Sequence, residues 1–371
     1  MFRIEMLPAR QGDCLWIEYG QPDAVHRVLI DGGVVATYDI LRERLERLPR
    51  DERRFELVVV THVDRDHIEG ILKLLGDARL GLVVDEIWYN GWRHLDPAST
   101  GGTGSVPNDV PADLLGPLQG EFLSAVILER QIPWNVRFGG GPVAVDERPR
   151  SITLGGGLEI TLLAPDAQGL ARIRDLWRET VVDKGLDPGD TEAALEYLHE
   201  KRTELVPPDL LGDEERIDLE ELAESPFSAD RSRANASSIA FLATYDGKTC
   251  LFAGDAPPGV LAPGLAALGL RHVDAWKLAH HGSKKSTSGR QLATLAADRY
   301  LFSTDGSYFR HPDDEILARI LANQRDTPKE FVFNYPLEAI FRDAEPLRTW
   351  RDPELQDRYR FALVENPVVE L

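Results

Sequence analysis

Apolar and polar positions alternate along this chain with the periods of both strands and helices. In the first half, alternating or continuous apolar runs predict strands at 2–7, 14–19, 27–30, 55–60, 82–89 and 151–165. In the second half, the same pattern predicts strands at 238–245, 248–253, 273–279 and 300–306. Helical spacing of apolar residues recurs at 38–48, 68–75, 118–130 and 313–321. Strands and helices thus alternate in two series, which predicts an α/β fold of two halves with a shared site between them.

Two stretches interrupt this pattern. Residues 96–117 are rich in Gly, Pro, Ser and Thr, which predicts a flexible loop near the mouth of the site. Residues 169–233 place a few apolar side chains among many charges, with nine basic and eighteen acidic residues from Ala171 to Arg233. This pattern favours an acidic helical insertion that serves as a lid or a partner surface, and the alternative is a solvated excursion with no role. With 371 residues and 43% hydrophobic content, we expect a single domain over 1–371 that contains both stretches.

Charge and cysteine content narrow the class of protein. The net charge of −20 opposes attraction to polyanions, which counts against a freestanding nucleic-acid binder. A bound metal pair would add positive charge locally, so a phosphate-bearing substrate stays compatible with this charge. Cys14 and Cys250 each lie in an apolar run and are expected to be buried thiols. No window approaches eighteen consecutive apolar residues, and the N-terminus reads into a strand, so we expect a cytoplasmic protein without a membrane partner.

The densest chemistry lies directly after the strand predicted at 55–60. His62, Asp64, Asp66 and His67 bring two imidazoles and two carboxylates into six consecutive positions. Neutral imidazole nitrogen and carboxylate oxygen are the ligands that divalent transition metals take from proteins. The alternative is a polar loop in which Asp66 caps the following helix, but capping explains one carboxylate and neither histidine.

A second cluster follows the strands predicted at 248–253 and 273–279. Asp255 ends the first of these strands, and His280 and His281 follow the second in a turn that ends in Gly282 and Ser283. Adjacent residues on a strand point to opposite sides, but in a turn both can line one site. The sequence does not decide which histidine binds metal; we expect His281 to be the ligand and His280 to touch the substrate. Asp31, after the strand at 27–30, is placed to orient a metal ligand.

The first cluster resembles the signature loop of the metallo-β-lactamase superfamily, His-x-His-x-Asp-His, with Asp64 in place of the second histidine. Further elements are similar to the ComEC-type branch, the metallo-hydrolase domain of the competence DNA-uptake protein. They are the turn from Gln11 to Asp13, Asn235 to Ser238, the Lys-x-x-His-His-Gly-Ser run from Lys277 to Ser283, and the stretch from Ser307 to Pro312. Together these matches cover most of the chain.

The resemblance implies a metallo-β-lactamase-like four-layer αβ/βα sandwich that holds two divalent metal ions. One metal would take His62, Asp64 and Asp166, which stands where the superfamily normally has a histidine, and the other Asp66, His67 and His281, with Asp255 bridging. Because Asp64 replaces an imidazole, the metal preference shifts from pure zinc toward manganese or iron without excluding zinc. The candidates for catalysis or substrate contact are Asp66, His280 and His311, which lies near a helix start where an anion can bind.

No Gly-x-Ser-x-Gly and no Gly-x4-Gly-Lys motif occurs, so an enzymatic function depends on the metal cluster alone. The favoured function is a phosphodiesterase or nuclease that acts on a phosphate-containing substrate, single-stranded nucleic acid among them. The enzymatic alternative is a hydrolase of a small ester or lactone. A third hypothesis, from a different class, is a regulatory protein that keeps the fold and binds a protein partner through the acidic insertion.

Overall fold

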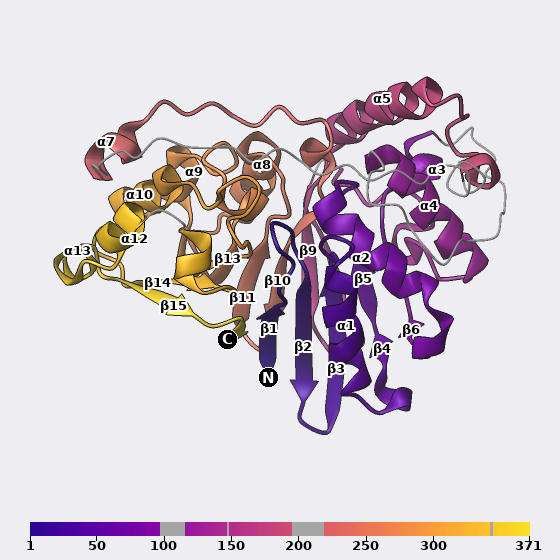
Figure 1. Cartoon of the computed structure of the whole chain (residues 1–371), viewed down its shortest axis with the longest axis horizontal. Helices are drawn as coiled ribbons and strands as arrows, with labels where there is room; N and C mark the ends of the chain where they lie inside the picture. The colour runs from indigo at the N-terminus through magenta and orange to yellow at the C-terminus, as the bar shows by residue number, and fades with distance from the viewer. Residues whose placement is uncertain (97–115, 147, 195–218, 342–343) are drawn as a thin grey trace.

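Two mixed β-sheets lie face to face in the computed structural model, which describes residues 1–96, 116–146, 148–194, 219–341 and 344–371 (Figure 1). The six-stranded sheet has the order β16-β1-β2-β3-β5-β7, and the eight-stranded sheet has the order β15-β14-β13-β12-β11-β10-β9-β8. The strands of the first sheet are β1 (Phe2–Met6), β2 (Leu15–Gln21), β3 (Ala24–Ile30), β5 (Leu57–Val59), β7 (Ile87–Trp88) and β16 (Val368–Glu370). Those of the second are β8 (Arg150–Thr153), β9 (Glu159–Ala164), β10 (Ala240–Tyr245), β11 (Lys248–Phe252), β12 (His272–Lys277), β13 (Ala296–Phe302), β14 (Lys329–Phe333) and β15 (Phe361–Glu365).

Helices cover the outer face of each sheet. The first sheet carries α1 (Thr37–Glu46), α2 (Arg65–Gly76), α3 (Trp92–Leu95), α4 (Gly116–Glu129) and α5 (Ala167–Asp183) on its side of the molecule. The second carries α7 (Leu219–Glu224), α8 (Pro258–Leu268), α9 (Gly289–Thr294), α10 (Asp314–Asn323), α11 (Leu337–Ile340), α12 (Ala344–Trp350) and α13 (Pro353–Tyr359). In Figure 1 the two helical groups stand on opposite sides of the paired sheets.

The alternation of side chains along the strands explains these layers. On β2, Ile17 belongs to the core between the sheets, whereas its neighbour Trp16 belongs to the core under α1, α2 and α4. On β12, Ala275 likewise faces the core between the sheets, and Trp276 faces the core under the helices of the second half. Both sheets are therefore buried on both faces, which is why their strands read as nearly continuous apolar runs. The predicted four-layer αβ/βα sandwich is confirmed.

Two of the predicted strands are each divided between sheets. The run at 55–60 contributes β5 to the six-stranded sheet, but its start forms β4 (Arg54–Phe55), which pairs with β6 (Val83–Val84) in a separate two-stranded sheet. The division falls at Glu56, whose carboxylate accepts a hydrogen bond from Tyr19 Oη at 2.6 Å. Phe55 packs in the core under the helices and Leu57 in the core between the sheets, although residues two apart share a face in a continuous strand. The run at 82–89 is divided in the same way into β6 and β7.

The first part of the predicted acidic insertion is a packed helix. Trp177 of α5 is fully buried in the core under α4, and its indole Nε1 donates a hydrogen bond to Glu121 Oε1 at 2.7 Å. Residues 195–218 of the insertion and 97–115 of the predicted flexible loop lie outside the described residues. A role of the acidic segment as a lid or partner surface stays a prediction. Among the described residues, no helix is both long and apolar enough to cross a membrane.

Candidate metal centre

The His/Asp loop follows β5 and leads into α2. The helix begins at Arg65, and its N-cap residue is Asp64, whose side chain makes no capping hydrogen bond. Asp66 lies in the first turn of the helix. Neither carboxylate is therefore consumed as a helix cap, and both remain available to the histidines beside them. Helix capping by an aspartate therefore does not explain why these four side chains gather in the loop.

Three imidazole nitrogens and one carboxylate oxygen converge here without a hydrogen-bond partner. The buried atoms are His62 Nε2, His67 Nε2, His281 Nε2 and Asp255 Oδ1. Asp255 lies between the imidazoles: its Oδ1 is 3.5 Å from His67 Nε2, and its Oδ2 is 3.8 Å from His62 Nε2 and 3.9 Å from His281 Nε2. A buried polar atom left without a partner costs about 1–3 kcal/mol. Such a concentration at one point fits a site built to hold a ligand.

Carboxylates at the start of the helix and Asp255 lie beside the histidines in two groups of potential ligands. Asp64 Oδ2 lies 3.5 Å from His62 Nε2, and Asp66 Oδ2 lies 3.5 Å from His281 Nε2. His62, His67 and Asp255 form one group that can hold a metal ion, and Asp66, His67 and His281 form another. Imidazole nitrogen with carboxylate oxygen is the donor set of zinc, manganese and iron sites, so the residues present fit divalent transition metals.

The Nδ1 atoms of His67 and His281, which point away from the cluster, each have a hydrogen-bond acceptor. His67 Nδ1 lies 2.8 Å from Asp31 Oδ2, and His281 Nδ1 donates to the carbonyl oxygen of Ser303 at 3.0 Å. Asp31 also accepts from Thr61 N at 2.8 Å and from Thr61 Oγ1 at 2.7 Å, which ties the loop to the end of β3. Because Nδ1 carries the proton, the lone pair of Nε2 points into the site. Asp31 thus has the orienting position expected of it.

A buried ion pair between Lys277 and Asp13 contacts the ring of His281. Lys277 Nζ donates to Asp13 Oδ2 at 2.8 Å, and Asp13 Oδ1 lies 3.2 Å from His281 Nδ1. Lys277 was part of the Lys-x-x-His-His motif, but nothing in the sequence predicted this contact with a residue 264 positions away. Gly12 lets the turn that carries Asp13 lie against the start of α2, since a Cβ at position 12 would lie 1.9 Å from the carbonyl oxygen of Asp66.

The turn after β12 directs both adjacent histidines to the same carboxylate. His280 and His281 have φ values of 51° and 56°, the left-handed region that non-glycine residues rarely adopt. As a result, His280 Nε2 lies 3.9 Å from Asp255 Oδ2, the same distance as His281 Nε2. Strain of this kind costs on the order of 1–3 kcal/mol per residue and concentrates at functional sites. Both histidines therefore line the site, as a turn permits.

His280 and His311 lie next to each other beside the cluster, where His280 is partly exposed and His311 is buried. Asp230 Oδ2 lies 3.4 Å from His280 Nδ1 and accepts a hydrogen bond from Asn235 Nδ2 at 2.6 Å. The ring of His311 packs against that of His280 with centroids 5.3 Å apart. Asp230 was not among the predicted site residues, because its position in an acidic stretch of sequence distinguishes it from none of its neighbours. In Figure 1 its segment returns from α7 across the top of the molecule to β10.

Asp166 occupies a different environment from the other predicted ligands. It is exposed, precedes α5 as its N-cap, and accepts a hydrogen bond from Gly169 N at 2.7 Å. The candidate metal-binding groups found among the described residues include neither Asp166 nor His280. His280 differs from Asp166 in facing the cluster, since its Nε2 lies 3.9 Å from Asp255 Oδ2.

Opposite charges dominate the electrostatics of the cluster. Burial alone would raise the pKa of Asp255, but the imidazoles of His67, His280 and His281 hold it well below its usual range. Burial would lower the pKa of His281, yet the carboxylates of Asp13, Asp255 and Asp66 raise it to about 9. The carboxylates thus create a negative potential at the point where the imidazole rings converge, which favours a positive charge there, carried by protons or by a bound metal ion.

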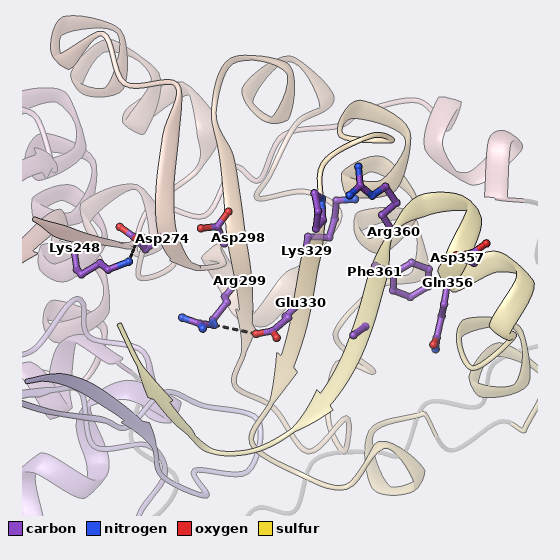
Figure 2. Close-up of a pocket in the computed structure, with 12 residues that line it drawn as sticks. Lys248, Asp274, Asp298, Arg299, Lys329, Glu330, Gln356, Asp357, Arg360 and Phe361 are labelled. Carbon is purple, nitrogen blue, oxygen red and sulfur yellow. Dashed lines mark hydrogen bonds and ion pairs between the residues drawn. The ribbon is translucent and has the colours of Figure 1, made fainter.

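A hollow lies at the opposite end of the second sheet. Its volume is about 730 Å³, and it is lined at the amino ends of β11 to β15 (Figure 2). Two ion pairs lie along it, since Lys248 Nζ donates to Asp274 at 2.7 Å and Arg299 Nε to Glu330 at 2.9 Å. The His/Asp cluster lies at the carboxyl ends of β5, β11 and β12, the edge of an α/β sheet where ligands bind.

Comparisons with known proteins do not assign this chain to a family. No family model matches the sequence, and no curated protein matches it. A mutant of the CmlA β-hydroxylase covers 100% of this chain with 11% identity and a TM-score of 0.37, and this chain spans 54% of that protein. A HARLDQ-motif mutant of a metallo-β-lactamase from Cronobacter sakazakii matches 94% of this chain, and the match spans 81% of that protein, with 13% identity and a TM-score of 0.26. Neither is named as a ComEC-type protein, and at these scores neither supports an inference about activity, so the fold rests on the sheet topology above.

Proposed function

We propose that this protein is a metal-dependent hydrolase that uses two divalent metal ions, and that its substrate is a phosphodiester. The observation that carries the proposal is the convergence of three buried, unpartnered Nε2 atoms on Asp255. An imidazole whose Nδ1 is held by a carboxylate or carbonyl and whose Nε2 is left free is arranged as a metal ligand.

The residues divide into two ligand sets that share Asp255. The first comprises His62, Asp64 and His280, and the second comprises Asp66, His67 and His281. In this assignment His280 replaces Asp166, the ligand that the family resemblance implied, because the Nε2 of His280 lies beside Asp255 Oδ2. Asp64 keeps the first set richer in oxygen than three histidines would be, which favours manganese or iron alongside zinc.

When bound, two such cations lower the pKa of a shared water and stabilise the attacking and leaving oxygens of a displacement. The chain's own residues supply the framework for that chemistry. Asp31, Asp13 and Asp230 fix the rings of His67, His281 and His280, so that little reorganisation is needed during the reaction. Asp66, from the first turn of α2, faces His281 and completes the wall on that side.

His311 supplies a further contact on the substrate side. Its Nδ1 lies 3.4 Å from Asp313 Oδ2, which orients the ring beside that of His280. We assign it to an oxygen of the substrate ester. The choice of a phosphodiester over a lactone is supported by this imidazole and by the sequence resemblance to the ComEC-type branch, and it is the part of the proposal that a substrate panel must decide.

The test is metal analysis joined to a substrate panel. Protein purified without chelator, or titrated with manganese, iron or zinc, should bind two equivalents, and His281→Ala should bind fewer. His272→Ala is the matched control, because His272 is an exposed residue at the amino end of β12 and its loss should leave both equivalents in place. The loaded enzyme should hydrolyse a dinucleotide faster than a lactone.

Two results would contradict the proposal at different levels. Absence of metal binding in the folded protein would remove the metal-dependent enzyme altogether. If the protein has its full metal content and hydrolyses the lactone, but hydrolyses neither the dinucleotide nor single-stranded DNA, then the metal centre is correct and the proposed substrate class is wrong.

A further inference from the structure

Two exposed aromatic side chains stand at the mouth of the metal centre. Tyr308 and Phe309 are 38% and 46% exposed, and with Phe227 they are the exposed aromatic residues among the described part of the chain. They lie in the loop between β13 and α10, and Arg310 separates Phe309 from His311. An aromatic side chain exposed beside a polar site loses the stabilisation of burial, so a role in binding is the natural explanation.

Ring contacts connect this loop to Asp255 without a break. Phe309 stacks on His311 with centroids 5.7 Å apart at 23°, and its ring meets the edge of His280 at 6.0 Å. His280 Nε2 in turn lies 3.9 Å from Asp255 Oδ2. Tyr308 packs its ring perpendicular to Phe309, with centroids 4.3 Å apart, which fixes the orientation of Phe309. One face of Phe309 is thus occupied by His311, while much of its ring surface stays exposed.

We propose that Phe309, held by Tyr308 and His311, is a stacking surface for a planar aromatic base of the substrate, so that the phosphodiester cleaved is a nucleotide one. The position of this base next to the cleaved ester rests on the proposed function. The ring of Phe309 contacts His280, which in turn lies beside Asp255, so it stands where the base of a nucleotide could lie when the ester is at the metal centre. Stacking on such a ring contributes to binding with little dependence on which base is present. A lactone or an alkyl phosphodiester has no such ring.

The charge around this loop is mixed. Arg10 and Arg310 are exposed, and the backbone N–H of Asp305 donates to the carbonyl oxygen of Arg10 at 2.9 Å. Asp305 and Asp313 belong to the same loop, so the arginines balance the carboxylates and the inference rests on the aromatic ring.

Affinity measurements test base stacking independently of hydrolysis. We would measure, by calorimetry on the metal-loaded protein, the affinities for thymidine 5′-monophosphate and for 2-deoxyribose 5-phosphate, which lacks the base. The wild type should bind the nucleotide about tenfold more tightly than the sugar phosphate. Phe309→Leu should abolish this preference, and Phe309→Trp should retain it. Phe227→Leu is the matched control, since Phe227 is 39% exposed but packs on Arg319 of α10, outside the chain of rings.

Equal affinities of the wild type for the two ligands would overturn the inference, and so would an equal loss of preference in Phe227→Leu and Phe309→Leu. Hydrolysis distinguishes this failure from that of the proposed function. If a dinucleotide and its analogue lacking one base are cleaved with the same KM, the phosphodiesterase stands and the stacking surface falls. If the base preference in binding holds but no phosphodiester is cleaved, the stacking surface stands and the proposed reaction falls.

Discussion

The two ends of the eight-stranded sheet differ in how they satisfy their buried polar atoms. At the amino ends of the strands, Asp274 accepts hydrogen bonds from Lys248, from Thr249 N and from Thr249 Oγ1, all within 3.0 Å. At the carboxyl ends, Asp255 Oδ1 and the Nε2 atoms of three histidines have no partner at all.

The hollow of about 730 Å³ lies at the first end and the unsatisfied atoms at the second. A fold normally pairs its buried polar groups, and a cluster that stays unpaired implies a partner from outside the chain. The unmet hydrogen bonds, which gather at the carboxyl ends of the strands, therefore locate the candidate site.

The strongest test of this comparison makes the same substitution at both ends. Asp255→Asn should reduce the hydrolysis rate about 10³-fold, or about 4 kcal/mol of transition-state stabilisation, because it removes the one carboxylate shared by both ligand sets. Asp274→Asn should leave the rate within about twofold. Steady-state rates and metal content of both variants provide the measurement. Equal rates in the two variants would show that Asp255 is not a ligand.

A buried carboxylate away from both ends sharpens the comparison. Glu121 of α4 accepts hydrogen bonds from Trp177 Nε1 and Gly189 N, with no cation beside it, and burial raises its pKa to about 7. A raised pKa means that the folded state binds the proton more tightly, so stability is present below about pH 4.5 and is lost as the pH rises through about 7. Glu121→Gln should therefore stabilise the protein by up to about 3 kcal/mol at pH 8 and have little effect at pH 4.

Urea unfolding of the wild type and of Glu121→Gln across this pH range measures the effect. Glu129→Gln, at an exposed position of the same helix, is the control and should leave the profile unchanged. A wild-type profile that does not fall between pH 4.5 and pH 7 relative to Glu121→Gln would mean that the Glu121 carboxyl is not perturbed as the structure indicates.

The smallest expected effect concerns orientation of a ligand. Asp31→Asn keeps the size of the side chain but removes its charge and one of the two oxygens that accept from His67 Nδ1 and from Thr61. Metal affinity should fall about 10- to 100-fold, as is typical when the residue behind a metal-bound histidine is changed. Metal titration followed by calorimetry measures this affinity, with Asp274→Asn again as the variant at the other end. An unchanged affinity would show that the backbone alone positions His67.

Much of the fold followed from periodicity, because strands buried on both faces and amphipathic helices leave strong local patterns. The loop from His62 to His67 was likewise visible, since its ligand types are adjacent in sequence. Local pattern did not reveal the division of 55–60 between two sheets, which depends on Glu56 reaching Tyr19 on another strand. It also gave no function to the last fifty residues, whose β15 and β16 extend the two sheets.

The tertiary structure decided the contacts between residues far apart in the chain. The sequence by itself determined which residue types were present for a metal centre: His62, Asp64, Asp66, His67, Asp255, His280 and His281. It could not place Asp166 at a helix N-cap, bring Asp230 to His280, or pair Lys277 with Asp13. Side-chain chemistry is encoded locally, but which side chains meet is set by the packing of two sheets against each other, and no local pattern contains that information.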